Sequence, residues 1–526
     1  MVIEDQEAAR RLEALRSRDL EFGQAAEKFA VEYRSHLGGT VEPYDFPDIA
    51  PFEDFYSPFI YTNPHLSNRQ RKSKVTILSK GKFRIFIPKN CVISTTLMKI
   101  LEQVGDADFA YADSFHFDPS DHSQFTHQLR PGWSPERLLG HCYVGDVVIA
   151  TKKLVRRAGG EKFLASLTSH DRALRLSETA KSPMHLSVLL YGSPIESRIP
   201  AIDVDAVRSH CARTGIDAEV TLSADGVAVK VIRRRTSRPT VCAIMPTRGT
   251  SAEVFGTQVV LAAHSLQKFQ ERSTFGEVEI IVVADSETPA SAIDEIAKAA
   301  GSEVSFITYN SSFNFAEKIN IAAVRTDADY LLFVNDDTEI ITPEIIDIML
   351  SYFEDPTVGM VGPMLKYEDG TIQSAGHLLN PIPFDLYRGC DVRIDSGFGI
   401  LNVAREVSSV IAAFSMTPRT LFNEVGGLSQ LFPADYNDID YGLKLDMLGY
   451  RTIVTPHAEC FHFESKTRTP GQKPESVALL GKRWQHKIEN DQYGNACLQP
   501  YQFLWKSNHD SSWSLREATG ADTVIP

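Results

Sequence analysis

Short apolar segments alternate with helical patterns from residue 241 to residue 464, and this alternation constrains the fold more than any other feature of the chain. The segments 241–245, 279–285 and 330–334 are rich in Val, Ile and Leu and end in polar residues, as buried strands do. Strands that alternate with helices form a mostly parallel sheet with helices on both faces. The sequence therefore predicts an α/β fold for its second half.

The chain of 526 residues is too long for one ordinary domain. Residues 3–36 read as one amphipathic helix, with apolar residues recurring among charged ones at Leu12, Leu15, Leu20, Phe29 and Tyr33. A connector rich in Pro and aromatic residues follows, and the basic segment RRRTSRP closes a mixed α/β stretch. We therefore expect four parts: an N-terminal helix and connector (1–66), a smaller α/β domain (67–235), a larger α/β domain (240–470) and a helical tail (471–526).

Charge and cysteine usage narrow the class of protein. The formal net charge of −14 disfavours nucleic acid as a partner. No apolar run reaches the roughly 18 residues of a membrane span, no signal-peptide pattern is present, and the seven cysteines are scattered without a CxxC pair. These features predict a cytoplasmic protein without a disulfide framework. The basic clusters 152–157 and 233–238 read as a solvated helix face and a linker, or alternatively as a patch for anionic lipid or a phosphate-bearing acceptor.

The strongest chemical signal is the segment YLLFVNDDTE, in which an apolar strand ends in Asn335, Asp336 and Asp337. Ligands of open α/β sheets bind at the carboxyl ends of strands, where these residues are expected. Adjacent carboxylates repel each other unless a cation compensates, and a divalent ion bridging a carboxylate and a diphosphate would do so. The alternative is a polar turn whose Asp caps the following helix.

Four further segments place polar groups at the ends of predicted strands or helices. VCAIMPTR (241–248) and EIIVVAD (279–285) are strands ending in a Pro-Thr-Arg turn and in Asp285. The segment FPADYNDIDYGLKL sets Asp438 and Asp440 at a helix start, where one could cap the helix and the other accept a proton from a hydroxyl. His462 ends another apolar stretch and is either structural or a second ligand beside Asp337, in which case the mixed N/O set favours Mn²⁺ over Mg²⁺.

The order of these motifs resembles family 2 glycosyltransferases of the GT-A fold, particularly bacterial enzymes of surface-polysaccharide assembly of the rhamnosyltransferase type. The resemblance covers about 241–468 and runs through PTR, VVAD, FNFAEKIN, YLLFVNDDTEII, VGPMLKYEDGTIQSAG, FNEVGGL, FPADYNDIDYGLKLDMLGYR and HFES. It implies a nucleoside-diphosphate sugar as donor, a divalent metal (Mn²⁺ or Mg²⁺) and a glycan or glycoconjugate as acceptor. A lipid-linked acceptor would add peripheral membrane contact, and the oligomeric state stays open.

The resemblance also implies a role for each matching residue. Thr247 and Asp285 would contact the nucleotide base, and Asp336 the ribose. Asp337 would bind the metal together with His462, and Asn335 replaces the first acid of the DxD motif. Asp438 would be the base of an inverting enzyme and Asp440 a supporting acid. The remaining donor-binding positions in the matched motifs are Pro246, Arg248 and Asn320. The nearest string to the QxxRW motif of processive enzymes is LGKRW (480–484), which lacks the Gln, so we expect the addition of one or a few sugars.

The first half resembles the same family more faintly. IATKKLVRRAGG (149–160) parallels MTPRTLFNEVGG (416–427), and Asp171 parallels Asp440. The DxD position falls in 87–90, where no acid is present. We therefore expect a degenerate glycosyltransferase-like domain that serves packing, acceptor binding or assembly.

Two competing functions remain at the level of sequence. A nucleotidyl- or phosphoryl-transferase would need a P-loop or a second acidic cluster, and neither is visible. A non-catalytic carbohydrate-binding or scaffold protein derived from a transferase is the other alternative, against which the set of Asp337, Asp438 and His462 argues.

Overall fold

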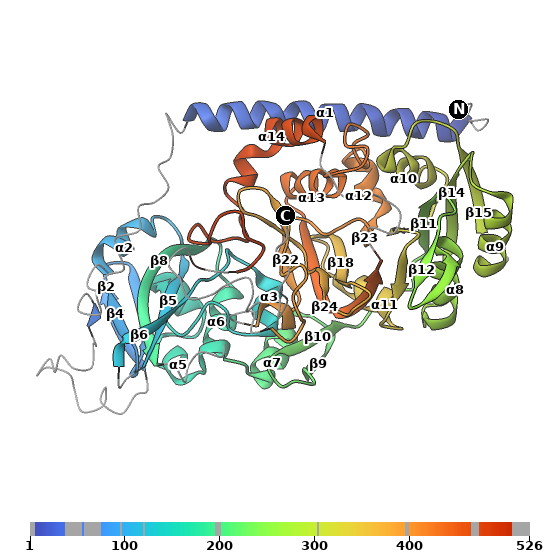
Figure 1. The fold of residues 1–526 in the computed structure, drawn as a ribbon. Coiled ribbons are helices and arrows are strands. Elements are labelled where there is room, and N and C mark those ends of the chain that lie inside the picture. Colours follow the sequence, from blue (N-terminus) through green and yellow to red (C-terminus); the bar gives the residue numbers. More distant parts are fainter. Residues whose placement is uncertain are drawn as a thin grey trace, which may run out of the picture.

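The computed structural model describes most of the chain, shown in Figure 1. The described residues are 6–36, 55–56, 75–94, 97–118, 121–194, 201–301, 304–394, 399–463, 473–505 and 507. Within these residues, no helix combines the length and the apolar character needed to cross a lipid bilayer.

The second half is built on a ten-stranded sheet whose main order is β15-β14-β11-β16-β23-β18-β24-β17. Its strands are β11 (Val241–Thr247), β14 (Glu279–Asp285), β15 (Val304–Tyr309), β16 (Tyr330–Val334), β17 (Thr338–Ile340), β18 (Val358–Lys366), β19 (Ile372–Ser374), β22 (Arg405–Val407), β23 (Phe414–Pro418) and β24 (Arg451–His462). The first four strands of this order are parallel, as predicted, whereas β23 turns antiparallel to β16 and makes the rest of the sheet mixed. All seven residues of β11 are buried, which explains its unbroken apolar run.

Helices cover both faces of this sheet, which confirms the predicted α/β class. The helices are α8 (Leu261–Arg272), α9 (Ala290–Ala300), α10 (Phe315–Ala323), α11 (Ile345–Tyr352), α12 (Arg419–Glu424) and α13 (Asn437–Met447). One core cluster joins α8, α9 and α11 to the sheet, and a second joins α10, α12 and α13 to its other face. Small elements complete this half: β12 (Ser251–Val254), β13 (Thr257–Val260), β20 (His377–Leu379), β21 (Pro383–Asp385) and the 3-10 helix Ile400–Asn402.

The first half contains an eight-stranded sheet of order β1-β4-β8-β5-β7-β3-β2, with β6 beside β5. Its strands are β1 (Phe55–Tyr56), β2 (Val75–Lys80), β3 (Phe83–Pro88), β4 (Val92–Ser94), β5 (Phe109–Asp118), β6 (Asp121–Gln128), β7 (Val148–Thr151) and β8 (Pro183–Pro194). The other elements are α2 (Leu97–Gln103), α3 (Pro135–Gly140), α4 (Lys152–Arg157), α5 (Glu161–Ser166), α6 (Ser169–Ser177), α7 (Val204–Thr214) and the hairpin of β9 (Ala218–Leu222) with β10 (Val229–Arg233).

The two sheets share a pattern of strand pairing. In the first, β5 pairs parallel with β8 and antiparallel with β6 and β7, while β7 pairs with β3 and β8 with β4. In the second, β18 pairs parallel with β24 and antiparallel with β19 and β23, while β23 pairs with β16 and β24 with β17. The chain order of these elements is also the same. Among the residues that the structure describes, the first sheet has no counterpart of β14 or β15, and β2 runs antiparallel to β3 where β11 runs parallel to β16.

The sequence repeats fall on matching elements of this shared pattern. IATKKLVRRAGG lies on β7 and α4, and MTPRTLFNEVGG on β23 and α12. Both Gly pairs, 159–160 and 426–427, have positive φ, which glycine adopts without strain. Asp171 lies in the first turn of α6 and Asp440 in the first turn of α13.

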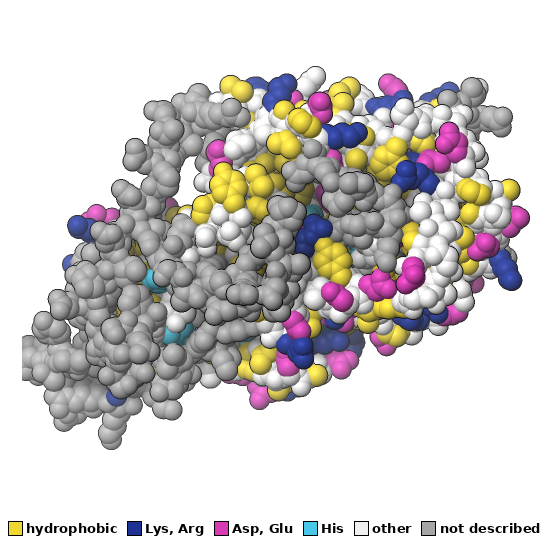
Figure 2. Space-filling view, viewed as in Figure 1, with side chains coloured by type: hydrophobic (Ala, Val, Ile, Leu, Met, Phe, Trp, Pro, Cys, Tyr) yellow, Lys and Arg dark blue, Asp and Glu magenta, His cyan; other side chains and the backbone are white. Residues whose placement is uncertain are grey.

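The long helix α1 (Gln6–His36) runs along the second half, across α10, α12 and the C-terminal helix α14 (Pro474–Ile488) (Figure 1). Its buried face differs from the predicted one. Leu12 and Leu15 are buried, but Leu20 and Phe29 are 54% and 49% exposed, and the side chain of Tyr33 lies outside the described residues. Figure 2 accordingly shows hydrophobic side chains mixed with charged ones along the surface of this helix.

From residue 19 onward, small residues and one acid take the place of the expected apolar face of α1. Ala26 and Ala30 are fully buried, and a Cβ on Gly23 would lie 2.4 Å from a guanidinium nitrogen of Arg483 in α14. Asp19 is buried and binds the fully buried ammonium of Lys444 at 2.6 Å. The helix is therefore fixed by close backbone approach and a buried ion pair, features that the spacing of large apolar residues does not reveal.

Candidate active site

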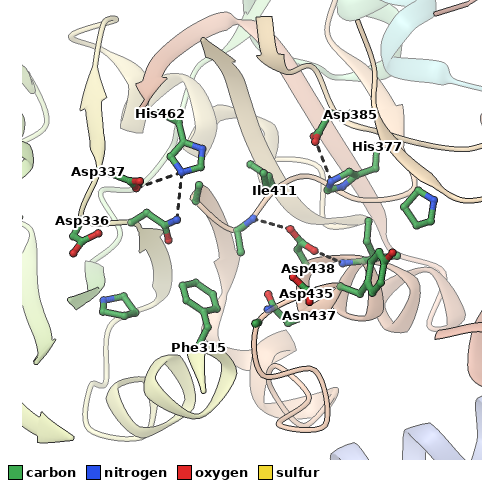
Figure 3. Close-up of a pocket in the computed structure, with 18 of the residues that line it drawn as sticks. Phe315, Asp336, Asp337, His377, Asp385, Ile411, Asp435, Asn437, Asp438 and His462 are labelled. Carbon is green, nitrogen blue, oxygen red and sulfur yellow. Dashed lines mark hydrogen bonds and ion pairs between the residues drawn. The ribbon is translucent and has the colours of Figure 1, made fainter. Parts of the chain in front are cut away.

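A cavity of about 830 Å³ opens at the carboxyl ends of β11 and β16, within the size range of ligand sites (Figure 3). Figure 3 shows Asp336, Asp337 and His462 at one end and Asp438, His377 and Asp385 at the other. The predicted residues that line it are Pro246, Thr247, Arg248, Asn335, Asp336, Asp337, Asp438 and His462. The structure thus brings together most of the residues that the motifs singled out.

Strand pairing brings Asp337 and His462 together. The antiparallel register of β17 and β24 sets Thr338 opposite His462, so the residue before β17 faces the end of β24. The Nε2 atom of His462 lies 3.3 Å from Oδ1 of Asp337 and 3.5 Å from Nδ2 of the Asn335 side chain. Both Asp337 and His462 are 5% exposed. One carboxylate oxygen and one imidazole nitrogen are thus available at the edge of the cavity.

These two donors fit a divalent transition metal such as Mn²⁺, which accepts carboxylate and imidazole ligands. Among the described residues, no group of three or more His, Cys, Asp or Glu side chains is arranged to hold a metal. A cation at this end of the cavity would thus need further oxygen ligands from water or from a bound molecule.

Asp336 is held by the turn that follows β11. The Thr247 hydroxyl donates a hydrogen bond of 2.7 Å to Oδ2 of Asp336, and the amide of Gly249 donates to the same hydroxyl. Gly249 has φ +67°, a conformation that favours glycine at this tight turn. Burial, and then the neighbouring charge of Asp337, raises the pKa of Asp336 to about 7. Lys318, Arg248 and the Thr247 hydroxyl act in the opposite direction and offset only part of this effect, so the site opposes two adjacent ionised carboxylates.

Lys318 is a cavity residue that sequence reasoning missed. It lies on α10, lines the cavity and is only 1% exposed. Its ammonium binds Asp285 at 2.6 Å and lies over the rings of Tyr309 and Phe313. Burial lowers its pKa, and the ion pair with Asp285 opposes this shift. In the sequence, Lys318 is marked only as the Lys of the matched segment FNFAEKIN. Asp285 binds Lys318 and does not itself line the cavity.

Asp438 begins α13 at the other end of the cavity. Its carboxylate accepts hydrogen bonds from the amides of Ile439 (2.9 Å) and Ala412 (3.3 Å), while the Ser409 hydroxyl donates to its backbone oxygen. Burial raises its pKa above the ordinary range, although His377 and the two amides act in the opposite direction. A half-buried carboxylate with a raised pKa is a stronger proton acceptor than a solvated one.

A hairpin of β20 and β21 adds a second group of residues that the sequence did not single out. His377 and Asp385 are paired in its register, with Nε2 of His377 3.4 Å from Oδ1 of Asp385. Arg388 follows, and donates a hydrogen bond of 2.7 Å to the Tyr367 hydroxyl. All four side chains line the cavity. Tyr367 lies within the matched motif VGPMLKYEDGTIQSAG, whereas His377, Asp385 and Arg388 follow that motif and belong to none of the matched segments.

Three predicted site residues do not line the cavity: Asp285, which holds Lys318, and Asp440 and Asn320. Asp440 is fully buried and accepts hydrogen bonds of 2.9 Å from Arg483 and from the Trp484 indole. Asn320 is also buried, and its side-chain amide exchanges hydrogen bonds with the backbone of Leu428. The second residue of NDID lines the cavity and the fourth does not, so spacing alone could not separate the role of Asp438 from that of Asp440. Both Asp440 and Asn320 hold neighbouring segments in place.

A comparison with known protein families finds a match within the second half of the chain. Residues 280–365, which run from β14 to β18, match the model of a family described as "Glycosyltransferase like family". This match confirms the resemblance that the motifs indicated for that segment.

Two curated proteins align over longer stretches. The O-antigen biosynthesis protein RfbC of Myxococcus xanthus is 27% identical over 363 residues, 66% of this chain and 28% of RfbC. The uncharacterized protein y4gI of Sinorhizobium fredii (strain NBRC 101917 / NGR234) is 25% identical over 492 residues, 85% of this chain and 52% of y4gI. The chain thus spans about a quarter to a half of the length of these relatives.

Two solved structures overlap with about half of the chain. GalNAc-T7 with UDP, GalNAc and Mn²⁺ has a TM-score of 0.37 and 11% identity, covering 48% of this chain and 49% of its own. The mannosyltransferase PcManGT from Pyrobaculum calidifontis with GDP-Man and Mn²⁺ has a TM-score of 0.32 and 15% identity, and the overlap covers 50% of this chain and 74% of PcManGT. Both overlaps are partial.

Proposed function

We propose that this chain is an inverting, metal-dependent glycosyltransferase that moves a sugar from a nucleoside-diphosphate sugar to a hydroxyl of a glycan or glycoconjugate. The observation that carries the proposal is the arrangement of one cavity, with Asp337 and His462 at one end and Asp438 at the other. The match of residues 280–365 to a glycosyltransferase-like family, and the O-antigen biosynthesis named for one relative, support the reaction class and a role in surface polysaccharide assembly.

Asp337 and His462 would hold the divalent cation. When bound, this cation supplies positive charge against the diphosphate of the donor. Asp336, fixed by Thr247, offers its free carboxylate oxygen to a ribose hydroxyl, and the buried Lys318 offers a positive charge nearby. Arg248 is exposed at the rim of the cavity over the ring of Phe313, where it can reach a base or a phosphate.

Asp438 would remove the proton from the acceptor hydroxyl. The acceptor oxygen then forms a bond to the anomeric carbon while the bond from that carbon to the diphosphate oxygen breaks. A single displacement of this kind inverts the anomeric configuration. Asp438 suits the role because its carboxylate faces the cavity and two backbone amides fix its orientation.

The first half would not perform this chemistry. It repeats the strand pairing around β18 and β24, but its described part has no counterpart of β14 or β15, which lead into the donor end of the cavity. The position that corresponds to Asn335–Asp337 follows β3 and holds Lys89, Asn90 and Cys91, none of which is an acid. We therefore take it as a degenerate copy with a structural role.

The alternative is a non-catalytic carbohydrate-binding protein derived from a glycosyltransferase. A panel of UDP-, GDP- and dTDP-sugars, each incubated with the full chain and Mn²⁺, separates the two by release of nucleoside diphosphate. We expect release with at least one donor, loss of release in Asp337→Ala and Asp438→Asn, and normal release in Asp294→Asn, an exposed acid on α9. Binding of a sugar without release from any donor would favour the alternative.

A further inference from the structure

The C-terminal segment 490–505 passes between the two halves of the chain and reaches the cavity. It follows α14, and the half-buried ring of Phe503 lines the cavity together with the β20–β21 hairpin. The cavity wall beside Asp438 is therefore built from two segments that lie more than a hundred residues apart in the sequence, as the separation of 119 between Asn380 and Gln499 shows.

Four backbone-directed hydrogen bonds attach the hairpin to this segment. The Asp491 carboxylate accepts from the amide of Leu379 (2.9 Å), and the Asn380 side chain donates to the oxygen of Gln499 (2.8 Å). The amide of Tyr501 donates to the oxygen of Asn380, and the amide of Tyr387 donates to the oxygen of Phe503, both at 2.8 Å. The hairpin has only three residues in each strand, so these contacts fix its position on the sheet.

The same segment is anchored in the first half of the chain. The side-chain amide of Asn495 donates to both oxygens of Asp113 at 3.0 Å and to the backbone oxygen of Arg130 at 2.8 Å. Asp113 is 1% exposed, and the amide of Arg130 and the His185 ring also bind it. Packing is close as well, since a Cβ on Gly132 would lie 1.7 Å from the oxygen of Gln492.

The hairpin held in this way carries His377 and Asp385, which face Asp438. His377 lowers the pKa of Asp438 and Asp385 raises it, so both charges act on that carboxylate. Phe384 and Phe503 add aromatic surface to the same wall. Aromatic rings beside carboxylates, an imidazole and the Arg388 guanidinium suit a sugar ring, which offers both an apolar face and hydroxyl groups.

We infer that segment 490–505, anchored by Asn495 in the first half, forms the acceptor wall and that Phe503 determines which sugar acceptors are used. The inference rests on the proposed function. It gives the degenerate first half a role: it is the support on which the acceptor wall is positioned. Phe503 would contact the acceptor, while Asn495 is a positioning residue that acts through the segment.

Phe503→Ala tests the contact. Its half-buried ring lies at the edge of a core cluster, and its backbone bond to Tyr387 remains after the change. With a panel of methyl and 4-nitrophenyl glycosides as acceptors, we expect the acceptor KM to rise about tenfold, while donor hydrolysis without acceptor and binding of the nucleoside diphosphate with Mn²⁺ stay unchanged. The matched control is Tyr501→Asn, an aromatic side chain of the same segment that is 62% exposed and does not line the cavity.

Asn495→Asp tests the anchor, since it keeps the shape but removes the donor and sets a second carboxylate beside Asp113. We expect faster hydrogen exchange in residues 376–387 and a raised acceptor KM, with unchanged exchange in β11 and unchanged nucleotide binding. Equal acceptor KM values for Phe503→Ala and wild type, or unchanged exchange in Asn495→Asp, would overturn the inference while donor hydrolysis continued. Absence of hydrolysis with every donor in the wild-type chain would instead overturn the proposed function, and the inference with it.

Discussion

His462 Nε2 lies 3.3 Å from Asp337 Oδ1, and the pairing of β17 with β24 holds the two side chains at one end of the cavity. The relationship joins a strand-end acid to a histidine from the last strand of the sheet. Asp438 lies at the other end of the same cavity.

Removal of divalent cations is expected to abolish release of nucleoside diphosphate, because Asp337 and His462 alone leave the diphosphate charge unbalanced. Excess EDTA should stop the reaction and added Mn²⁺ should restore it. Asp337→Ala should weaken nucleotide binding as well as turnover, as measured by calorimetry with UDP and GDP in the presence of Mn²⁺. Full activity in EDTA would contradict the metal role.

Asp438→Asn should lower the transfer rate by about 10²–10⁴-fold, the usual contribution of a positioned base, with little change in nucleotide binding. Asp440→Asn should instead lower stability by about 1–3 kcal/mol, because it weakens buried hydrogen bonds to Arg483 and Trp484. Turnover and urea unfolding, measured for both variants, decide which of the two aspartates is the base. A collapsed rate in Asp440→Asn with a normal rate in Asp438→Asn would reverse it.

The rate should fall on the acid side at a pH above that expected for a solvated aspartate. Asp438 accepts a proton only when ionised, and burial raises its pKa, so activity increases as the pH rises through that value. His377→Gln removes a charge that lowers the pKa of Asp438, and its acid limb should move to higher pH. Profiles of kcat/KM against pH for the two proteins measure the difference. Superimposable profiles would show that His377 does not act on Asp438.

Asp19→Ala should destabilise the chain by about 3–5 kcal/mol, because it leaves the buried ammonium of Lys444 without its closest partner. The matched control is Glu32→Ala, which removes an exposed ion pair of the same helix with Lys28 and should cost at most about 1 kcal/mol. Urea unfolding followed by circular dichroism compares them. Equal midpoints would mean that α1 contributes little to the second half.

Asp171→Asn in the first half should keep the transfer rate within about a few-fold of wild type, because no metal-binding residue accompanies it. Asp171 is half-buried on α6 and pairs with Arg175 at 3.6 Å, and we expect the folded state to tolerate Asn because it keeps the shape of the side chain. A loss of rate as deep as that of Asp337→Ala would make the first half a second active centre.

The sequence predicted those parts of the site that depend on one strand and the residues directly after it. The positions of Asp336 and Asp337 follow from the end of β16, and that of Thr247 from the end of β11. A strand that is buried on both faces has a continuous apolar run, and this run predicts where the strand ends. The α/β class and the glycosyltransferase-like segment could be predicted for the same reason.

At the other end of the cavity, Asp438 was predicted but the β20–β21 hairpin beside it was not, because its position depends on contacts between distant segments. His377 and Asp385 lie in a short hairpin that takes its position from residues 490–505. The buried face of α1 was also misjudged, since Gly23 and Asp19 pack where larger apolar residues were expected. The spacing of side chains shows which residues share a face of a helix. It does not show which face packs against the rest of the protein, because the neighbouring elements are not known from the sequence.

The ion pair between Asp19 and Lys444 also has a consequence for the order in which the chain is made. The two residues are separated by 425 positions, so Asp19 leaves the ribosome long before its partner exists. At about 5–20 residues per second, α1 would wait roughly 20–90 seconds with its small-residue face uncovered. The second half therefore reaches its final form only when α1, which is made well before it, packs against it.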